Sequence, residues 1–261
     1  MIRLLDPFRR QRQRAFEDSI RDGDILVALE RFEQAVESYE LALSIEPDNS
    51  TAHFKMGTAY AGIRRYGEAT ECFRRAVSLN PLDPVALYNL GVALGEMGRY
   101  DEAVTALGRA IQIDPNDAEA HCNLGVAYEG IGQHEKAARE YELALQIGLI
   151  FAREVPNTHC RLGRVYCELG RYDEAISSLN QAVAIDPGFA EAHNLLGEAY
   201  MLTSSYEEGI AACKTAISVR PGDADAYYKL GVAYDNTGHY EEAIEAYRRL
   251  ERLKPGDPLA P

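Results

Sequence analysis

The sequence predicts an all-α protein of the α-solenoid class, in which helical hairpins stack in a row. Proline recurs at intervals of 34 residues, at Pro47, Pro81 and Pro115 and again at Pro187, Pro221 and Pro255. Glycine occupies the eighth position of every period, and each period contains two apolar stripes of helical spacing. Because one such unit has too little core to fold alone, neighbouring units are expected to bury it by stacking.

This register gives seven units with short flanking segments. The interval from Pro115 to Pro187 is 72 residues, two periods plus four, so residues 152–155 are interpreted as an insertion. Residues 1–15 form a basic N-terminal arm, and residues 258–261 form a tail. The units span residues 16–49, 50–83, 84–117, 118–151, 156–189, 190–223 and 224–257.

The third unit shows how each hairpin is specified. Asp83 can cap the first helix, and Pro84 suits its first turn, where a missing N–H costs nothing. Gly98 suits the left-handed residue that ends this helix, and Pro115 stops the second one. The apolar residues expected on the two inner faces are Leu87, Leu90, Leu94, Ala103, Leu107 and Ala110.

Small residues recur where the two helices of a unit must cross closely. They are the eighth-position glycines (Gly23, Gly57, Gly91, Gly125, Gly163, Gly197, Gly231) and, on the second helices, Ala35, Ala69, Ala103, Ala137, Ala175, Gly209 and Ala243.

The inserted residues 152–155 equal about one helical turn, so either the second helix of unit four runs longer or a loop does. Glu251 replaces the apolar contact residue of earlier units, which predicts that the last unit faces water.

Residues 16–257 resemble tetratricopeptide (TPR) repeats, most closely in "LYNLGVALGEMGRYDEAVTALGRAIQIDP". The resemblance implies a right-handed superhelix whose first helices line a concave groove. It also implies a non-enzymatic role in binding peptides, tails or helices of other proteins. No unit has the fourth-position tryptophan of many family members, and His53, His121, His159 and His193 stand there instead.

The resemblance places positions two, five, six, nine and twelve of each first helix in the groove. Position six reads Arg21, Lys55, Asn89, Asn123, Arg161, Leu195 and Lys229. An asparagine amide both donates and accepts, so Asn89 and Asn123 match the backbone of an extended peptide; the alternative is a solvated polar surface. The candidate peptide-binding residues are Lys55, Tyr88, Asn89, Val92, Asn123, Val126, Arg161 and Arg164.

Two sharper site hypotheses are disfavoured. The set that grips chaperone C-terminal carboxylates in some TPR proteins is matched only at Asn123 and Arg161. Cys122, Cys160 and Cys167 are separated by about 10 Å along and between helices, too far for thiolates that must lie about 2.3 Å from one zinc ion. The sequence also lacks HExxH, P-loop and GxGxxG motifs, so no catalytic residue, metal or cofactor is predicted.

Composition excludes further classes. A net charge of −14 argues against nucleic acid as a partner, since phosphate contacts need basic surface. Five cysteines without a pairing pattern, no long apolar run and no signal-peptide pattern predict a cytoplasmic protein. The arm could touch an anionic membrane through Arg3, Arg9, Arg10, Arg12 and Arg14, but Pro7 interrupts an amphipathic helix, so a solvated leader that caps unit one is expected.

These observations predict a mostly monomeric scaffold or adaptor that binds peptide segments of other proteins in the groove. Two alternatives stay open. One is a substrate-recognition or targeting component of a larger enzyme system, such as a glycosyltransferase-associated array. The other is a self-assembling scaffold, which the charged residues around Glu251 disfavour.

Overall fold

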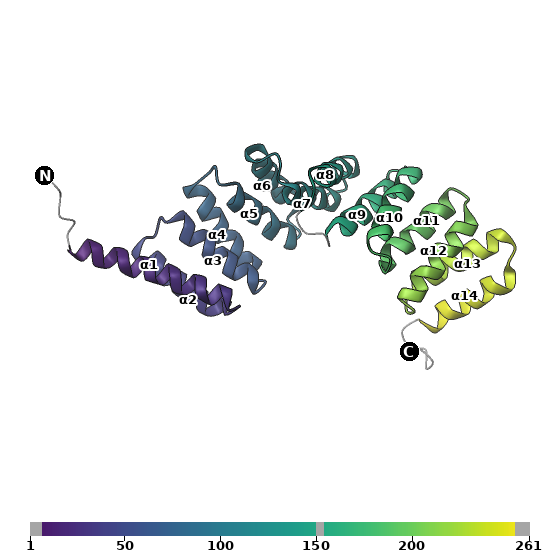
Figure 1. The fold of residues 1–261 in the computed structure, drawn as a ribbon, viewed down its shortest axis with the longest axis horizontal. Coiled ribbons are helices and arrows are strands. Elements are labelled where there is room, and N and C mark those ends of the chain that lie inside the picture. The colour runs from purple at the N-terminus through teal and green to yellow at the C-terminus, as the bar shows by residue number, and fades with distance from the viewer. Residues whose placement is uncertain (1–6, 150–153, 254–261) are drawn as a thin grey trace. The chain divides into compact units, whose positions relative to one another are not determined.

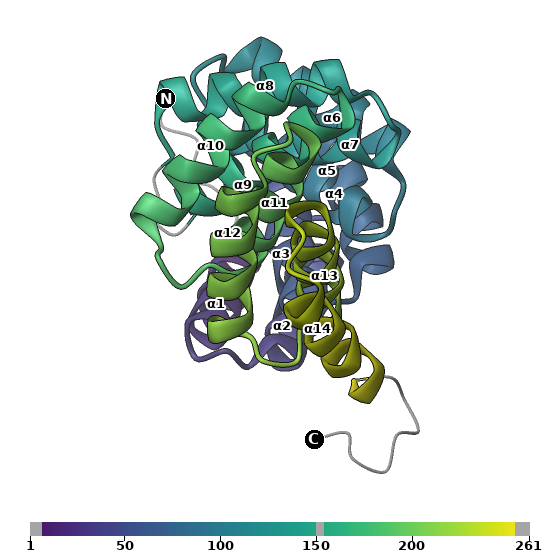
Figure 2. The same ribbon diagram turned by 90° about the vertical axis from the view of Figure 1, so that its right-hand side faces the viewer.

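The computed structural model describes residues 7–149 and 154–253, and in these ranges the chain forms helices and no strands (Figure 1). The chain divides into two compact units, Met1–Ile131 and Gly132–Pro261, which are described one at a time. Figure 2 views the helices from the side of α13 and α14.

Unit 1 contains three complete hairpins and one further first helix. Its helices are α1 (Pro7–Ala28), α2 (Phe32–Ile45), α3 (Ser50–Gly62), α4 (Tyr66–Leu79), α5 (Pro84–Glu96), α6 (Tyr100–Ile113) and α7 (Ala118–Gly130). The first helices α1, α3 and α5 each pack on their own second helix, and α2, α4 and α6 each pack on the next first helix. The first helices α1, α3, α5 and α7 also contact one another in order, so they form one layer of the unit.

Unit 2 follows the same plan. Its helices are α8 (His134–Ile147), α9 (Glu154–Glu168), α10 (Tyr172–Ile185), α11 (Ala190–Leu202), α12 (Tyr206–Val219), α13 (Ala224–Thr237) and α14 (Tyr240–Arg252). The first helices α9, α11 and α13 contact one another in order. The predicted all-α array of about seven helical hairpins is therefore confirmed.

The helix boundaries form as the sequence predicts. The Asp83 carboxylate accepts hydrogen bonds from the backbone N–H groups of Val85 and Ala86 at 3.0 and 3.1 Å, and Pro84 stands in the first turn. Gly98, predicted to end its helix, has a left-handed φ of 70°, and the glycines at the same place in other hairpins, Gly132, Gly170 and Gly238, have φ values of 71°, 71° and 78°. In the other three hairpins the corresponding turn holds a left-handed residue that is not glycine: Glu30, Arg64 and Ser204.

The fourth-position histidines fasten the start of the hairpins. The Nε2 atoms of His53, His121 and His193 lie 2.8, 3.2 and 3.0 Å from the carbonyl oxygens of Pro47, Pro115 and Pro187. Each contact joins a first helix to the proline that closes the preceding unit. These three side chains therefore have a structural role.

The two helices of a hairpin cross where glycine meets a large side chain. A Cβ atom added at Gly91 would lie 2.5 Å from Leu107 Cγ, and one at Gly57 would lie 2.7 Å from the Phe73 ring. Leu87, Leu107 and Phe73 are at most 1% exposed. The crossing glycines thus allow the helix approach that buries the core.

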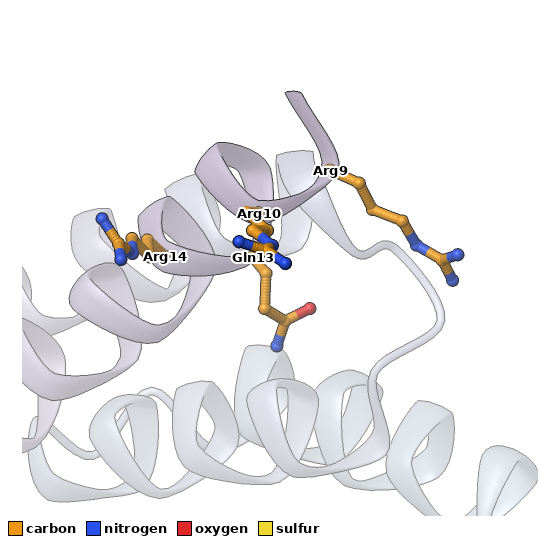
Figure 3. Close-up of a pocket in the computed structure, with 4 residues that line it drawn as sticks. All are labelled: Arg9, Arg10, Gln13 and Arg14. Carbon is orange, nitrogen blue, oxygen red and sulfur yellow. The ribbon is translucent and has the colours of Figure 1, made fainter. Parts of the chain in front are cut away.

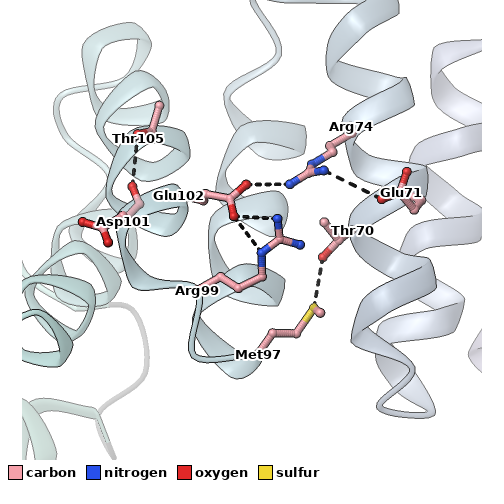
Figure 4. A network of polar contacts seen from close by, with 8 residues as sticks. All are labelled: Thr70, Glu71, Arg74, Met97, Arg99, Asp101, Glu102 and Thr105. Atoms are coloured by element: carbon pink, nitrogen blue, oxygen red, sulfur yellow. Dashed lines mark hydrogen bonds and ion pairs between the residues drawn. The ribbon is translucent and has the colours of Figure 1, made fainter.

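Ion pairs also link adjacent hairpins of unit 1 (Figure 4). Arg74 Nη2 on α4 donates to Glu102 Oε2 on α6 at 2.7 Å, and Arg99 Nε donates to Glu102 Oε1 at the same distance. Thr70 Oγ1 lies 3.7 Å from Met97 Sδ between the same hairpins. The side chains of Arg74, Arg99 and Glu102 are 38–47% exposed, so these ion pairs add little stability.

Two segments differ from the sequence expectations. Helix α1 begins at Pro7, so residues 7–15 continue the first helix of the first unit; the proline occupies its first turn and does not interrupt it. Helix α8, the second helix of the fourth 34-residue repeat, has 14 residues, as α2, α4 and α6 do, so it is not lengthened by the insertion. Of the insertion, Glu154 and Val155 open α9, and residues 152–153 lie outside the described residues.

Candidate functional site

Six of the eight predicted groove residues lie in unit 1, on the layer of first helices. We call this face of α3, α5 and α7 the first-helix surface, defined by Lys55, Tyr88, Asn89, Val92, Asn123 and Val126. All six side chains are half-buried, so each is held by neighbours and still reaches solvent. Arg161 and Arg164 lie on α9 in unit 2.

The two asparagines are anchored through their amide nitrogens. Asn89 Nδ2 donates to the Val85 carbonyl at 2.8 Å, and Asn123 Nδ2 donates to the Glu119 carbonyl at 2.9 Å. Asn123 Nδ2 also lies 3.3 Å from the Tyr88 hydroxyl. Since a carbonyl can only accept, these bonds fix which end of each amide is the donor. The oxygens Oδ1 of both residues have no hydrogen bond within the described part of the chain and are left as acceptors.

Lys55 is already paired within the protein. Its Nζ donates to both Asp24 oxygens at 2.6 and 2.7 Å, from α3 to α1. The Asp24 carboxylate also accepts a hydrogen bond from the Tyr39 hydroxyl at 2.8 Å. Burial, with that bond, raises the pKa of Tyr39. The Lys55 ammonium group thus stabilises the α1–α3 contact. It is less available to bind a ligand, because such binding would compete with Asp24.

A hollow of about 260 Å³ opens between α5, α6 and α7. Its floor includes Gly91 and Leu107, and Gly95 borders it without any neighbouring atom within 4 Å of where a Cβ would stand. Val92, Val126 and Ala127 add apolar surface. The polar side chains around the hollow are Glu96, Tyr100 and Asn123.

In unit 2 the equivalent helices carry a charged network. Lys229 Nζ on α13 lies 2.7 Å from both Glu198 Oε2 on α11 and Asp225 Oδ2. Asn194 Nδ2 donates to Asp225 Oδ2 at 3.0 Å, and Arg164 Nη1 lies 3.3 Å from Glu191 Oε1. This face is therefore occupied by ion pairs, in contrast to the uncharged centre of the first-helix surface.

Helix α1 carries a cluster of arginine side chains. A pocket of about 440 Å³ is bordered by Arg9, Arg10, Gln13 and Arg14, which project from one helix (Figure 3). Arg12 instead donates to the carbonyl oxygen of Ile45 and so docks α1 on α2. Arg3 and the rest of residues 1–6 lie outside the described residues, so the structure does not test membrane contact by the arm.

The thiols are suited to packing. Burial raises the pKa of Cys72 and Cys167 to about 11 and that of Cys213 to about 12, which keeps them protonated at neutral pH.

Within residues 7–149 and 154–253, no group of three or more His, Cys, Asp or Glu side chains is placed to hold a metal ion. In the same ranges, no helix has the length and apolar character of a bilayer span.

Sequence reasoning missed the hollow and the intramolecular partners of the lysines. The sequence did contain a signal for the hollow. The third 34-residue repeat is the only one with glycine at position twelve (Gly95) and leucine (Leu107) at the position where repeats one, two, four and seven carry an aromatic ring. The signal for the lysine partners was weaker. It required knowing that Asp24 and Lys55, 31 residues apart, lie on adjacent first helices.

Family comparisons give one consistent answer. Models described as TPR repeat match residues 23–63, 93–132 and 163–204. Models described as tetratricopeptide repeat match residues 206–258, 72–105, 50–83 and 118–148. These matches indicate no enzymatic family, and a comparison with curated proteins finds no match.

The chain matches solved structures of the same fold over most of the length of those structures. The chain is similar to YrrB, described as a TPR protein with an unusual peptide-binding site (TM-score 0.63, 24% identity, 73% of this chain and 96% of that one). It is similar to MamA from Desulfovibrio magneticus RS-1 (0.60, 25%, 66% and 95%). It also resembles the C-terminal part of a TPR protein from Cytophaga hutchinsonii (0.71, 17%, 92% and 97%). With its repeat period, its helical hairpins and these matches, the chain belongs to the tetratricopeptide repeat family.

Proposed function

We propose that the first-helix surface of unit 1 binds an extended peptide segment of another protein, and that the chain acts as a non-enzymatic scaffold or adaptor. The observation that carries the proposal is the pair of anchored amides. Asn89 and Asn123 stand at the same position of adjacent hairpins, with their nitrogens bonded to their own helices. Their oxygens are left to accept hydrogen bonds from a ligand.

The spacing of the two amides suits a peptide backbone. Packed helices lie about 8–10 Å apart, and an extended chain rises about 3.3 Å per residue. The two oxygens therefore address backbone N–H groups two or three residues apart. Tyr88, Val92 and Val126 supply apolar surface between and beside them, the usual composition of a peptide site.

The family supports this assignment. YrrB, which has a similar fold, is described as having a peptide-binding site. In unit 2, Arg161 and Arg164 are proposed as additional contacts for acidic side chains of a partner, and Arg164 is proposed to contribute less because it is already paired with Glu191. Lys55 is proposed to contribute less, because its ammonium group is already bonded to Asp24.

Selection from a random-peptide display library tests the proposal. We expect the full chain to enrich a set of peptides that bind the double variant Asn89→Ala, Asn123→Ala at least tenfold more weakly. Asn236→Ala is the matched control, since Asn236 Nδ2 makes the same bond, to the Val232 carbonyl at 2.8 Å, on α13 of unit 2. Equal binding by all three proteins, or no enrichment by the wild type, would contradict the proposal.

A further inference from the structure

The hollow between α5, α6 and α7 lies where the side chains of the third hairpin differ from those of its neighbours. In the first, second and seventh hairpins, the side chain over the crossing glycine is a ring: Tyr39 over Gly23, Phe73 over Gly57 and Tyr247 over Gly231. In the third hairpin Leu107 covers Gly91 instead. The smaller side chain leaves space that a ring fills elsewhere.

Two other hairpins also lack the ring, but at position twelve they carry a side chain larger than that of glycine. There Leu179 and Cys213 replace the ring, and position twelve holds Cys167 and Met201. Met201 Cγ reaches to within 3.3 Å of where a Cβ of Gly209 would stand. The third hairpin has Gly95 at this position, with nothing near its Cβ site, so the space stays open.

The size and lining of the hollow indicate its occupant. About 260 Å³ is below the roughly 300–1,000 Å³ of pockets that enclose whole small molecules, so it suits one side chain of a longer ligand. Val92, Leu107 and Val126 offer apolar contact to a stem. The Asn123 amide nitrogen is already used, so this side chain offers its acceptor oxygen, and Glu96 offers an exposed carboxylate.

We infer that this hollow anchors a lysine or arginine side chain of the bound peptide. The inference rests on the proposed function and names the ligand chemistry of the same surface. The aliphatic stem packs against Val92, Leu107 and Val126, and the cation meets the Glu96 carboxylate and the Tyr100 ring. The Asn123 oxygen has two lone pairs, so it can accept from the cation and from a backbone N–H of the same peptide. No basic side chain lines the hollow among the described residues, and the net charge of −14 favours a basic segment.

Gly95→Met provides a test that spares the fold. Its side chain fills the hollow, no atom stands within 4 Å of its Cβ, and glycine in a helix is less favourable than methionine. Gly108→Met is the matched control, because Gly108 on α6 also has no neighbour within 4 Å and does not line the hollow. Both variants are expected to melt at or above the wild-type temperature.

The probes are N-acetyl-lysine methylamide and N-acetyl-arginine methylamide, with the norleucine analogue as the uncharged control. NMR of the Val92 and Val126 methyl groups should show millimolar binding of the cationic probes to the wild type and Gly108→Met. Gly95→Met should abolish the shifts, and Glu96→Gln should weaken binding about threefold. Equal shifts with norleucine would overturn the cationic assignment, and absent shifts would overturn the anchor site.

The peptides selected by the full chain separate this inference from the proposed function. If the site is correct, they carry lysine or arginine at one position and bind Gly95→Met at least tenfold more weakly than Gly108→Met. Peptides that lose affinity with the asparagine variant but bind Gly95→Met normally would overturn the inference and leave the proposed function standing. If no peptide is selected, the proposed function fails, and the shifts from the small probes still decide the anchor.

Discussion

Gly91→Leu is expected to destabilise the protein by about 3 kcal/mol, the largest effect we predict for a single substitution. Even a Cβ at this position would lie 2.5 Å from Leu107 Cγ and 2.9 Å from Leu107 Cδ2, closer than side-chain atoms approach in folded proteins. Leu107 is 1% exposed and cannot move into solvent. The helices α5 and α6 must therefore separate. Because each hairpin contacts only its neighbours, the α4–α5 and α6–α7 contacts weaken as well.

Thermal unfolding followed by circular dichroism measures this effect. A loss of about 3 kcal/mol corresponds to a fall in Tm of roughly 10 °C for a chain of this size. Gly108→Leu is the control and should be neutral or stabilising by up to about 1 kcal/mol, since Gly108 has open space around it. Similar melting of Gly91→Leu and wild type would mean that the crossing point of the hairpin is misplaced.

Lys229→Met is expected to destabilise the protein by about 2 kcal/mol. The Lys229 side chain is 11% exposed, and its loss leaves Glu198 and Asp225 facing each other without the cation that bridges them at 2.7 Å. Lys55→Met, at the same repeat position, removes a pair whose members are 29% and 44% exposed, so its effect should stay below about 1 kcal/mol. Urea unfolding of both variants tests this order, and a larger loss from Lys55→Met would contradict it.

The contribution of Lys229 should also depend on pH. Burial alone lowers the pKa of this ammonium group, but its hydrogen bonds to Asp225 and Glu198 outweigh burial, and the pKa is raised. A raised pKa stabilises the folded state below the unfolded value of about 10.4 and ceases to do so as pH rises through the folded value. The difference in unfolding free energy between wild type and Lys229→Met should therefore be constant from about pH 7 to 9.5 and shrink above about pH 10.5. A difference that grows above this pH would contradict the assignment.

Most of the fold could be predicted because its signals are local. Asp83, Pro84 and Gly98 act within a few residues of their own position, and each has the role its chemistry indicates. The left-handed turns at Glu30, Arg64 and Ser204 show the limit of this reasoning. There the packing of two helices imposes a backbone conformation that the residue itself does not favour, so no glycine marks it.

The candidate site was less predictable because its properties depend on neighbouring helices. The residues at position six lie on the first helices, but the sequence could not show that Lys55 and Lys229 are paired with carboxylates of adjacent hairpins. Nor could it show which end of the Asn123 amide is free, since that depends on the bond to the Glu119 carbonyl. The hollow depends on Gly95 and Leu107 together, and neither residue alone predicts it.

The most direct test of the central claim is the affinity of a selected peptide before and after N-methylation of single backbone N–H groups. If Asn123 Oδ1 accepts a hydrogen bond from the ligand backbone, one N-methyl group should weaken binding to the wild type about fivefold, beyond a purely steric loss. In Asn123→Ala this hydrogen bond cannot form, so the same N-methyl group should weaken binding only through its steric effect. Asn236→Ala should behave as the wild type. Equal losses in the wild type and Asn123→Ala at every position would contradict backbone recognition by the first-helix surface.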